Sequence, residues 1–497
     1  MKKEFKELLA DKGRKELPGV LLAAAECAPL AKTGGLADVV GTLPKDLKKL
    51  GIDARVIIPY HRLIKNKFAD KVEHITSFYS RIAGRDEYVG IEQIIVDDVI
   101  IYLVDSEYYY GDKIYRGGYP EIEQYAFFAR AVLDAAPILG YNIDVIHCND
   151  WHTAMIPFLA KTQYVGGMQA DLKFLLTIHN IAFQGKCDFG YIKWLLDIDD
   201  KYYTPDYIEL YGCANMMKAG CVFSDRINTV SPSYAEEIKS TYYAEGLDGI
   251  LNYRADVLTG IINGIDKVTF NPHSDSKIPA TYDRGHLKGK AICKEELQKA
   301  MGLDVNPDVP MFAMVTRMTE QKGFDLVACV LDELMNTENM QFMLLGTGDE
   351  RFENFMRAAE ARYPGKVCAY IGYNDELAHR IYAAADFYLM PSRFEPCGLS
   401  QMLAMRYGTL PIVRETGGLR DTVAPYNIYT NEGTGFTFAN YDAWEMRDCI
   451  RFALECWEDK AVMKGLINRA MEKDFGFEQS AIEYAKHYIW ILDSIKE

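Results

Sequence analysis

The chain has 497 residues, of which 49% are hydrophobic and 25% charged, a composition typical of a globular protein with two or three domains. Its formal net charge of −16 argues against nucleic acid or an anionic membrane surface as the main partner, because such binding needs a broad basic face. The 11 cysteines, an odd number without metal-binding spacing, favour reduced thiols in a cytosolic enzyme over disulfides or zinc.

The N-terminal part of the chain shows no targeting pattern. Residues 1–18 are rich in Lys and Glu and lack an apolar h-region, and no run of about 18 apolar residues could cross a bilayer. The following apolar run resembles a lipoprotein box that ends at Cys27, but Glu26 breaks the required small-residue pattern. We therefore interpret 20–26 as a first buried strand and expect a cytoplasmic protein.

Short aliphatic runs alternate with helical patterns, as parallel α/β folds require. The sequence predicts a first domain over residues 1–262 and a second over 263–479, separated near a polar stretch that contains Pro272 and Pro279, with a last helical pattern at 480–496. The predicted strands are 20–26, 55–60, 99–105, 144–149, 174–179, 226–230 and 258–262 in the first domain, and 311–316, 341–345, 367–372, 387–391 and 410–414 in the second.

One eight-residue pattern occurs twice, as Thr33-Gly-Gly-Leu-Ala-Asp-Val-Val40 and Thr416-Gly-Gly-Leu-Arg-Asp-Thr-Val423, with six identical positions. Each copy follows a strand-like run and precedes a helical pattern, so each places paired glycines where backbone N–H groups can point at an anion. An isolated Gly-Gly turn is usually a simple tight connection. Two copies in the same context instead indicate two similar α/β halves that face a shared cleft.

Basic residues stand close to these predicted strand ends, where parallel sheets bind ligands. Lys32 lies beside the first glycine pair, so its ammonium and the amides of the turn could converge on one phosphate. Arg317 ends the strand 311–316, and Lys322 follows five residues later. Preorganised cations of this kind stabilise the negative charge that develops on a nucleotide diphosphate as its sugar leaves.

Further polar residues end other predicted strands. Asp150 follows the run 144–149, and His179 with Asn180 follows 174–178, although buried histidines at strand ends are often held by backbone hydrogen bonds alone. Glu395 lies in a turn between a strand and a helical run that begins near Cys397, so its carboxylate can project into the cleft.

Glycine and tyrosine residues could shape the remaining parts of a site. Gly346-Thr-Gly348 and Gly372-Tyr373 follow neighbouring strands and could form a nucleotide pocket. A loop rich in tyrosine and glycine could stack on sugar rings, whose C–H faces fit aromatic planes, or could be a connection with half-buried rings. Its tyrosines are Tyr108, Tyr109, Tyr110, Tyr115 and Tyr119.

The one candidate metal motif is Asp197-Ile-Asp199, a pattern that some sugar transferases use to hold a divalent cation on a diphosphate. It lies away from any predicted strand end, which favours a solvated helix. Lys32, Arg317 and Lys322 could supply the positive charge instead, so we expect no metal.

The segment from Lys32 to Pro44 resembles the N-terminal signature of bacterial glycogen synthases and plant starch synthases. Further segments match this family in order and character along the whole chain: 150–152, 176–180, 263–266, 317–323, 391–399 and 416–423. The resemblance implies a GT-B type α/β fold, that is, two facing Rossmann-like domains with a deep interdomain cleft, and a C-terminal helix at 480–497 that packs back on the first domain. It also implies transfer of glucose from ADP-glucose to the non-reducing end of an α-1,4-glucan such as glycogen, starch or maltodextrin, with retention of configuration and without a cofactor.

The resemblance carries three groups of residues over to this chain. The implied catalytic residues are Glu395, Lys322, Arg317, His179 and Asp150. The implied donor-binding residues are Lys32, Gly34, Gly35, Asp38, Asn180, Asn263, Gly346, Tyr373, Thr416, Gly417 and Gly418. The implied acceptor-binding residues are Trp151, Tyr109 and Tyr115.

Two departures and three alternatives remain at the level of sequence. Cys148-Asn149 replaces the commoner Ala-His of the family, and the tyrosine-rich loop is this chain's own version of a variable region.

The alternatives are a catalytically silent glucan-binding paralogue, a sucrose-related or UDP-glucose transferase of the same fold, and a phosphorylase. The charged residues argue against the first, Lys32-Thr-Gly-Gly against the second, and the chain length against the third. An oligomer is possible.

Overall fold

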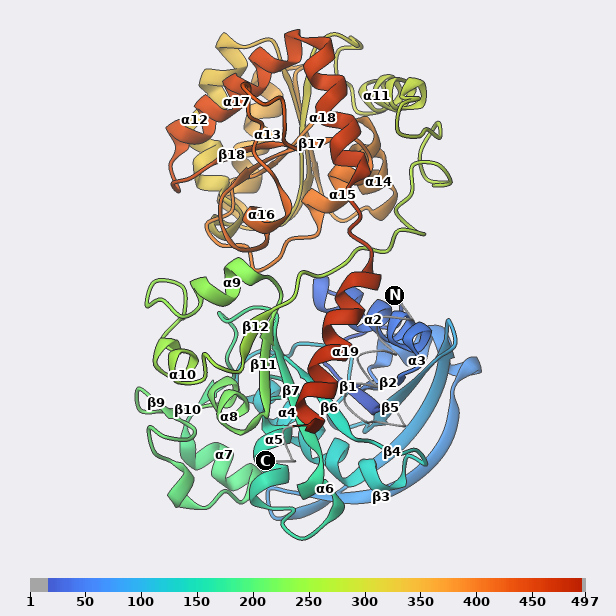
Figure 1. Ribbon diagram of the computed structural model, residues 1–497, viewed down its shortest axis with the longest axis vertical. Coiled ribbons are helices and arrows are strands. Elements are labelled where there is room, and N and C mark those ends of the chain that lie inside the picture. Colours follow the sequence, from blue (N-terminus) through green and yellow to red (C-terminus); the bar gives the residue numbers. More distant parts are fainter. Residues whose placement is uncertain (1–16, 494–497) are drawn as a thin grey trace. The chain divides into compact units, whose positions relative to one another are not determined.

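The structure, a computed structural model, describes residues 17–493. The chain separates into two compact units: the first runs to Gly264 and resumes at Phe477, and the second covers Ile265–Gly476. In Figure 1 each unit is a twisted sheet with helices packed on it. This confirms the predicted α/β class with two Rossmann-like units. None of the helices in the described range is long and apolar enough to cross a membrane.

The sheet of the first unit has nine strands in the order β12-β11-β7-β6-β1-β2-β5-β4-β3 within the described residues. Seven of them are parallel and overlap the seven predicted runs, with β1, β2 and β7 beginning one or two residues earlier, because strands covered on both faces read as continuous apolar segments. Their bounds are β1 (Gly19–Ala23), β2 (Asp53–Pro59), β5 (Val99–Asp105), β6 (Val145–Asn149), β7 (Lys173–Ile178), β11 (Arg226–Thr229) and β12 (Leu258–Gly260).

Two long antiparallel strands, β3 (Glu73–Ile82) and β4 (Arg85–Val96), extend this sheet and were not predicted. Most residues of β3 are exposed, so it has no apolar run that would mark it. The first unit also contains the short strands β8 (Lys186–Cys187), β9 (Glu209–Leu210) and β10 (Cys213–Asn215). Its helices before the second unit are α2 (Gly35–Leu50), α3 (Arg62–Phe68), α4 (Gly118–Ala135), α5 (Met155–Thr162), α6 (Met168–Asp171), α7 (Phe189–Leu196), α8 (Met216–Phe223), α9 (Pro232–Glu237) and α10 (Asp248–Tyr253). Its 3₁₀ turns are η1 (Ala69–Lys71), η2 (Ala136–Ile138) and η3 (Asp200–Tyr202).

The C-terminal helix α19 (Phe477–Asp493) belongs to the first unit, where it packs against α2 and β7. Its buried tyrosines share one hydrophobic core with α2 and β1. Polar contacts fix its register, because the Tyr488 hydroxyl lies 2.9 Å from Nδ1 of buried His147 and the Ser480 hydroxyl donates to the carbonyl of Ile262 at 2.7 Å. The end of the predicted helical pattern, from residue 494, lies outside the described residues.

The sheet of the second unit has six parallel strands in the order β15-β14-β13-β16-β17-β18. Five of them fall on predicted runs, and the short β18 was not predicted. The strands are β13 (Met311–Val315), β14 (Gln341–Gly346), β15 (Val367–Ile371), β16 (Phe387–Met390), β17 (Leu410–Arg414) and β18 (Phe436–Phe438). The helical elements are α11 (Lys288–Ala300), η4 (Glu320–Lys322), α12 (Phe324–Thr337), α13 (Glu350–Arg362), α14 (Asp375–Ala384), α15 (Ser400–Arg406), α16 (Gly417–Thr422), α17 (Ala443–Glu458) and α18 (Lys460–Glu472).

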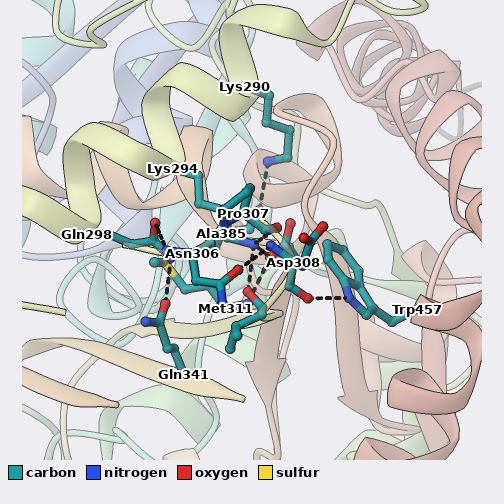
Figure 2. A network of polar contacts seen from close by, with 12 residues as sticks. Lys290, Lys294, Gln298, Asn306, Pro307, Asp308, Met311, Gln341, Ala385 and Trp457 are labelled. Atoms are coloured by element: carbon teal, nitrogen blue, oxygen red, sulfur yellow. Dashed lines mark hydrogen bonds and ion pairs between the residues drawn. The ribbon is translucent and has the colours of Figure 1, made fainter. Parts of the chain in front are cut away.

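Buried lysines of α11 fasten this helix to the amino-terminal edge of the second sheet (Figure 2). Lys294 forms an ion pair with Asp386 at 2.7 Å, and the same carboxylate accepts the Met311 N–H at the start of β13. Lys290 donates to the carbonyls of Ala383 and Ala385. Parallel sheets bind ligands at the carboxyl ends of their strands. This network instead stabilises the opposite, amino-terminal edge of the sheet.

Candidate functional site

Glu395 and Lys322 come together in the second unit, in the loops that follow β16 and β13. Glu395 is buried, with 6% of its surface exposed. The Lys322 Nζ lies 2.6 Å from its Oε2, and the Ser392 hydroxyl donates to the same oxygen at 3.0 Å. An ion pair with a second hydrogen bond holds the carboxylate in one orientation, and the role of Ser392 in this contact was not foreseen from sequence.

Glycines let the loops at the carboxyl edge of this sheet approach closely. A Cβ on Gly323, whose φ is +75°, would lie 2.2 Å from the carbonyl oxygen of Pro391. One on Gly346 would lie 1.9 Å from the carbonyl oxygen of Thr316. The loops after β13, β14 and β16 therefore pack backbone against backbone, which brings Lys322 beside Glu395.

One amide of the second glycine pair is taken up by a contact within the protein. The Gly418 N–H donates to the carbonyls of Glu395 and Pro396 at 3.1 and 3.2 Å, so it is engaged by the protein itself and does not point at an external anion. A Cβ on Gly417 would lie 2.0 Å from the Glu395 carbonyl oxygen. Buried Thr416 precedes the pair as the extended N-cap of α16. The pair thus seats α16 against the Glu395 loop.

The remaining predicted residues of the second unit lie at the same edge of the sheet. Arg317 follows β13 with an exposed side chain, and the next residue is joined to the loop after β14 because the Met318 N–H donates to Thr347 at 2.9 Å. Tyr373 follows β15 and is 86% exposed. Arg317 and Tyr373 are thus accessible from solvent in this unit.

In the first unit, Lys32 and Asp38 form a solvent-accessible ion pair at 2.7 Å at the start of α2. Gly34 is the extended N-cap and Gly35 the first helical residue. Glu26, which was read as part of a strand, lies against this turn and accepts the Thr33 N–H at 2.5 Å. The sequence did contain a signal for it, namely a carboxylate inside an otherwise apolar run.

Asp150, His179 and Asn180 lie together beyond β6 and β7. Asp150 has a left-handed backbone with φ +57°, and its Oδ1 accepts the N–H groups of His179 and Asn180 at 2.7 and 3.3 Å. Burial raises the pKa of Asp150 to about 7. The two N–H groups act to lower this pKa, and the charge of Glu26 acts to raise it. This carboxyl group therefore titrates near neutrality.

The hydrogen bond of His179 fixes which of its nitrogens can meet a ligand. Burial lowers the pKa of His179 to about 3, so the ring is neutral at physiological pH. Its Nε2 lies 2.9 Å from Oδ1 of Asn149, which can only accept, so Nε2 carries the proton and Nδ1 keeps a lone pair. The ring can therefore accept a hydrogen bond from a hydroxyl group. Sequence reasoning noted Asn149 as a departure but missed this contact.

Asn263, just after β12, carries an unsatisfied acceptor. The residue is 6% exposed, and its Oδ1 accepts no hydrogen bond from the described residues. Buried polar atoms without a partner are rare and often face a ligand. This observation fits the predicted donor-binding role of Asn263.

Two of the three predicted acceptor residues are buried in the core of the first unit, which is a correction. Tyr109 is 1% exposed, and its ring stacks on Phe127 with a centroid distance of 4.2 Å. Trp151 is 5% exposed and lies so close to Gly185 that a Cβ there would be 2.3 Å from the indole. Neither ring has a face available to a sugar. Tyr115 is partly buried, and its hydroxyl donates to Glu26 at 3.1 Å.

The candidate metal motif forms a turn, not a helix. The helix α7 ends at Leu196, Asp197 has φ +53°, and the Asp199 side chain caps η3. Across residues 17–493, no cluster of three or more His, Cys, Asp or Glu side chains is placed to hold a metal ion.

Two α/β units with polar residues beyond the carboxyl ends of their parallel strands have the ligand-binding layout of such sheets, and the family models that match them are those of glycosyltransferases. The starch synthase catalytic domain family matches residues 19–253, and the glycosyl transferases group 1 family matches residues 298–466. Glycogen synthase from Geobacillus thermodenitrificans (strain NG80-2) is 49% identical over 470 residues, which is 94% of this chain and 97% of that protein. Glycogen synthase from Clostridium kluyveri is 45% identical over 475 residues, or 95% of this chain and 100% of that protein. The chain belongs to the glycogen and starch synthase family and is a glucosyltransferase of the glycogen synthase type.

Solved structures agree with this assignment. The catalytic domain of Starch Synthase IV from Arabidopsis thaliana, bound to ADP and acarbose, superposes with a TM-score of 0.88 at 29% identity and covers 96% of this chain and 100% of that one. Sucrose-phosphate synthase from Thermosynechococcus elongatus gives a TM-score of 0.61 at 16% identity over 96% of this chain and 100% of that one, which shows the shared fold alone.

Proposed function

We propose that this protein transfers glucose from ADP-glucose to the 4-hydroxyl group at the non-reducing end of an α-1,4-glucan, with retention of anomeric configuration. The similarity to glycogen synthases over nearly the whole chain supports the reaction. The starch synthase structure that contains ADP and acarbose supports a nucleoside diphosphate and an oligosaccharide as ligands of the same protein. The observation that carries the proposal is the ion pair between Lys322 and the buried carboxylate of Glu395.

The basic residues act on the leaving group. As the bond between C1 of glucose and the phosphate oxygen breaks, negative charge grows on the diphosphate, and Lys322 with Arg317 stabilises it more than the ground state. Lys32, in the first unit, is also proposed to bind the diphosphate, for which it exchanges the carboxylate of Asp38 for a phosphate oxygen. Because Lys322 already lies in place against Glu395, little reorganisation is needed at the moment of reaction.

Other residues hold the sugar and the acceptor. Glu395 fixes the glucose hydroxyl groups, while Nδ1 of His179 accepts a hydrogen bond from a further hydroxyl group. The acceptor oxygen attacks C1 from the face that the diphosphate leaves, and its proton passes to the departing phosphate oxygen. This sequence retains configuration and needs no nucleophile from the protein. Asp150, in its ionised form, orients the loop that carries His179.

We propose that the reaction needs no metal ion, because lysine and arginine supply the positive charge that a divalent cation would bring. We also propose a cytoplasmic location, since the 11 cysteines are all free in the structure and a reducing compartment keeps them so. Acceptor contacts are proposed for two exposed tyrosines, Tyr108 in the loop and Tyr119 in the first turn of α4, in place of the buried Tyr109.

Incorporation of labelled glucose from ADP-glucose into maltodextrin, with and without EDTA, tests the proposal. We expect equal incorporation with and without EDTA. We also expect Lys322→Ala to lose incorporation, whereas the control Lys299→Ala, which changes an exposed lysine of α11, should retain it. Dependence on added metal would contradict the metal-free mechanism. Glucan binding without turnover of any nucleotide sugar would indicate a silent binding protein instead.

A further inference from the structure

A buried carboxylate fastens the first glycine turn of the chain to a neighbouring tyrosine. Glu26 follows β1 and is 2% exposed. Its Oε2 accepts the N–H and the hydroxyl of Thr33 at 2.5 and 2.9 Å, and its Oε1 accepts the Tyr115 hydroxyl at 3.1 Å. Burial raises the pKa of Glu26, and the backbone N–H groups of Thr33 and Gly34 act in the opposite direction. One side chain thus accepts hydrogen bonds from one amide and two hydroxyl groups in segments that are far apart in sequence.

The loop that Glu26 closes is tightly folded over the start of α2. Cys27 and Ala31 exchange two backbone hydrogen bonds, at 3.0 and 2.9 Å. The Ala28 N–H donates to Ala37 in α2 at 2.9 Å, and a Cβ on Gly41 would lie 2.4 Å from the Ala28 carbonyl oxygen. A negative charge is favourable at the N-terminus of a helix, so the carboxylate also stabilises the turn electrostatically.

Tyr115 connects this loop to the residues beyond β6. Its ring lies against His152 with a centroid distance of 5.0 Å, and the charge of Glu26 acts on Asp150. The other charged or titratable groups around this cluster are Glu121, 3.7 Å from Nε2 of His152, Tyr125, whose ring centroid lies 4.5 Å from that of His152, the Cys27 thiol, and the Lys32–Asp38 pair at the rim of the turn. Glu26 therefore lies between the turn that carries Lys32 and the residues around Asp150.

We propose that Glu26 is a positioning residue for glucosyl transfer, which fixes the Lys32–Gly34 turn and the Tyr115 hydroxyl in a single arrangement beside Asp150. This inference rests on the proposed function. Without the carboxylate, the amide and hydroxyl of Thr33 and the Tyr115 hydroxyl lose their shared acceptor. The turn then loosens, and Lys32 no longer starts from a fixed place when the diphosphate binds.

The variant Glu26→Gln keeps the shape of the side chain and removes its charge. We expect kcat to fall by roughly 10- to 100-fold, because a misplacement of about 1 Å in a positioned group costs about 100-fold, while the exposed control Glu73→Gln keeps full activity. The pH profile distinguishes this from a purely structural defect. Loss of the Glu26 charge lets Asp150 ionise more readily, so the acidic limb of kcat/KM moves to lower pH. Wild-type kcat together with an unmoved acidic limb would overturn the proposal.

Two further measurements keep the proposal testable if Glu26→Gln does not fold or if the proposed reaction is wrong. Tyr115→Phe deletes one donor and leaves Glu26 in place, so we expect a partial loss of kcat with an unmoved acidic limb. Hydrogen exchange of residues 27–38 needs no turnover, and we expect it to be faster in Glu26→Gln or Tyr115→Phe than in Glu73→Gln. Unchanged exchange in the folded variants would overturn the inference, whereas a wild-type protein inactive with every nucleotide sugar would instead refute the proposed function.

Discussion

Lys322 and Glu395, which are 73 residues apart in sequence, form an ion pair of 2.6 Å in which the carboxylate is almost fully buried. Removal of one partner leaves a buried charge without compensation, which costs about 3 kcal/mol in comparable pairs. Lys322→Met should therefore lose stability as well as activity. We expect kcat to fall on the order of 100-fold or more, because a preorganised cation is lost from the leaving group.

Stability and turnover should separate in the double variant Lys322→Met/Glu395→Gln. With both charges removed, denaturant unfolding should recover part of the lost stability, while glucose transfer should stay as low as in the single variant. Recovery of transfer together with stability would show that the pair has a structural role alone.

A methyl group at the second glycine pair should displace the Glu395 loop. Gly417→Ala places a Cβ 2.0 Å from the carbonyl oxygen of Glu395, so the loop must move. We expect at least a tenfold loss of kcat, since a small displacement of a catalytic group costs about 100-fold. Gly249→Ala is the matched control, because a Cβ there meets nothing within 4 Å. Normal kinetics in Gly417→Ala would contradict the packing role described for this pair.

The raised pKa of Asp150, about 7, predicts a pH dependence of activity. If the ionised carboxylate orients the His179 loop, kcat/KM should fall as pH decreases below about 7, by roughly tenfold per unit. Asp150→Asn keeps an acceptor for the two N–H groups and should lose this acidic limb together with much of the activity.

The folded protein also binds more protons at the Asp150 carboxyl group than the unfolded chain does between about pH 4 and 7. Its contribution to stability therefore decreases as pH rises through that range, which thermal unfolding of the two proteins can measure.

The burial of Tyr109 predicts a loss of stability when it is truncated. Tyr109→Ala removes a ring stacked on Phe127 and should cost about 3 to 5 kcal/mol. The KM for glucan of the folded fraction should stay unchanged. Tyr108→Ala, at a ring 62% exposed, should show the opposite pattern, with normal unfolding and a raised KM for glucan. Parallel denaturation and kinetic measurements on the two variants separate these outcomes.

The fold was predictable wherever burial imposes a strong pattern. Parallel strands such as β7 and β13 are covered on both faces, so their aliphatic runs stand out in the sequence. Strand β3 alternates between exposed and partly buried residues at the edge of the sheet and has no such run, so it was missed. The prediction of a helix at Asp197 failed because a left-handed residue ends α7 there, a conformation that aspartate adopts without a distinctive sequence signal.

The candidate site was predictable as a set of residues but not as a set of contacts. Lys322 and Glu395 were each found by their position after a strand, yet their pairing depends on the packing of loops at Gly323. Tyr109 and Tyr108 are adjacent and chemically identical, so only the direction of the chain decides which ring is buried. For the same reason the sequence showed Glu26 as an interruption of a strand and gave no sign of its bond to Tyr115.

Competition between ADP-glucose and UDP-glucose at equal concentration tests the proposed glucosyl transfer most sharply, with maltodextrin as primer and the linkage of the product determined by NMR. We predict that the label enters from ADP-glucose into new α-1,4 bonds, and that Lys322→Ala reduces this rate about 100-fold. Preference for UDP-glucose, or incorporation that is unaffected by Lys322→Ala, would contradict the account.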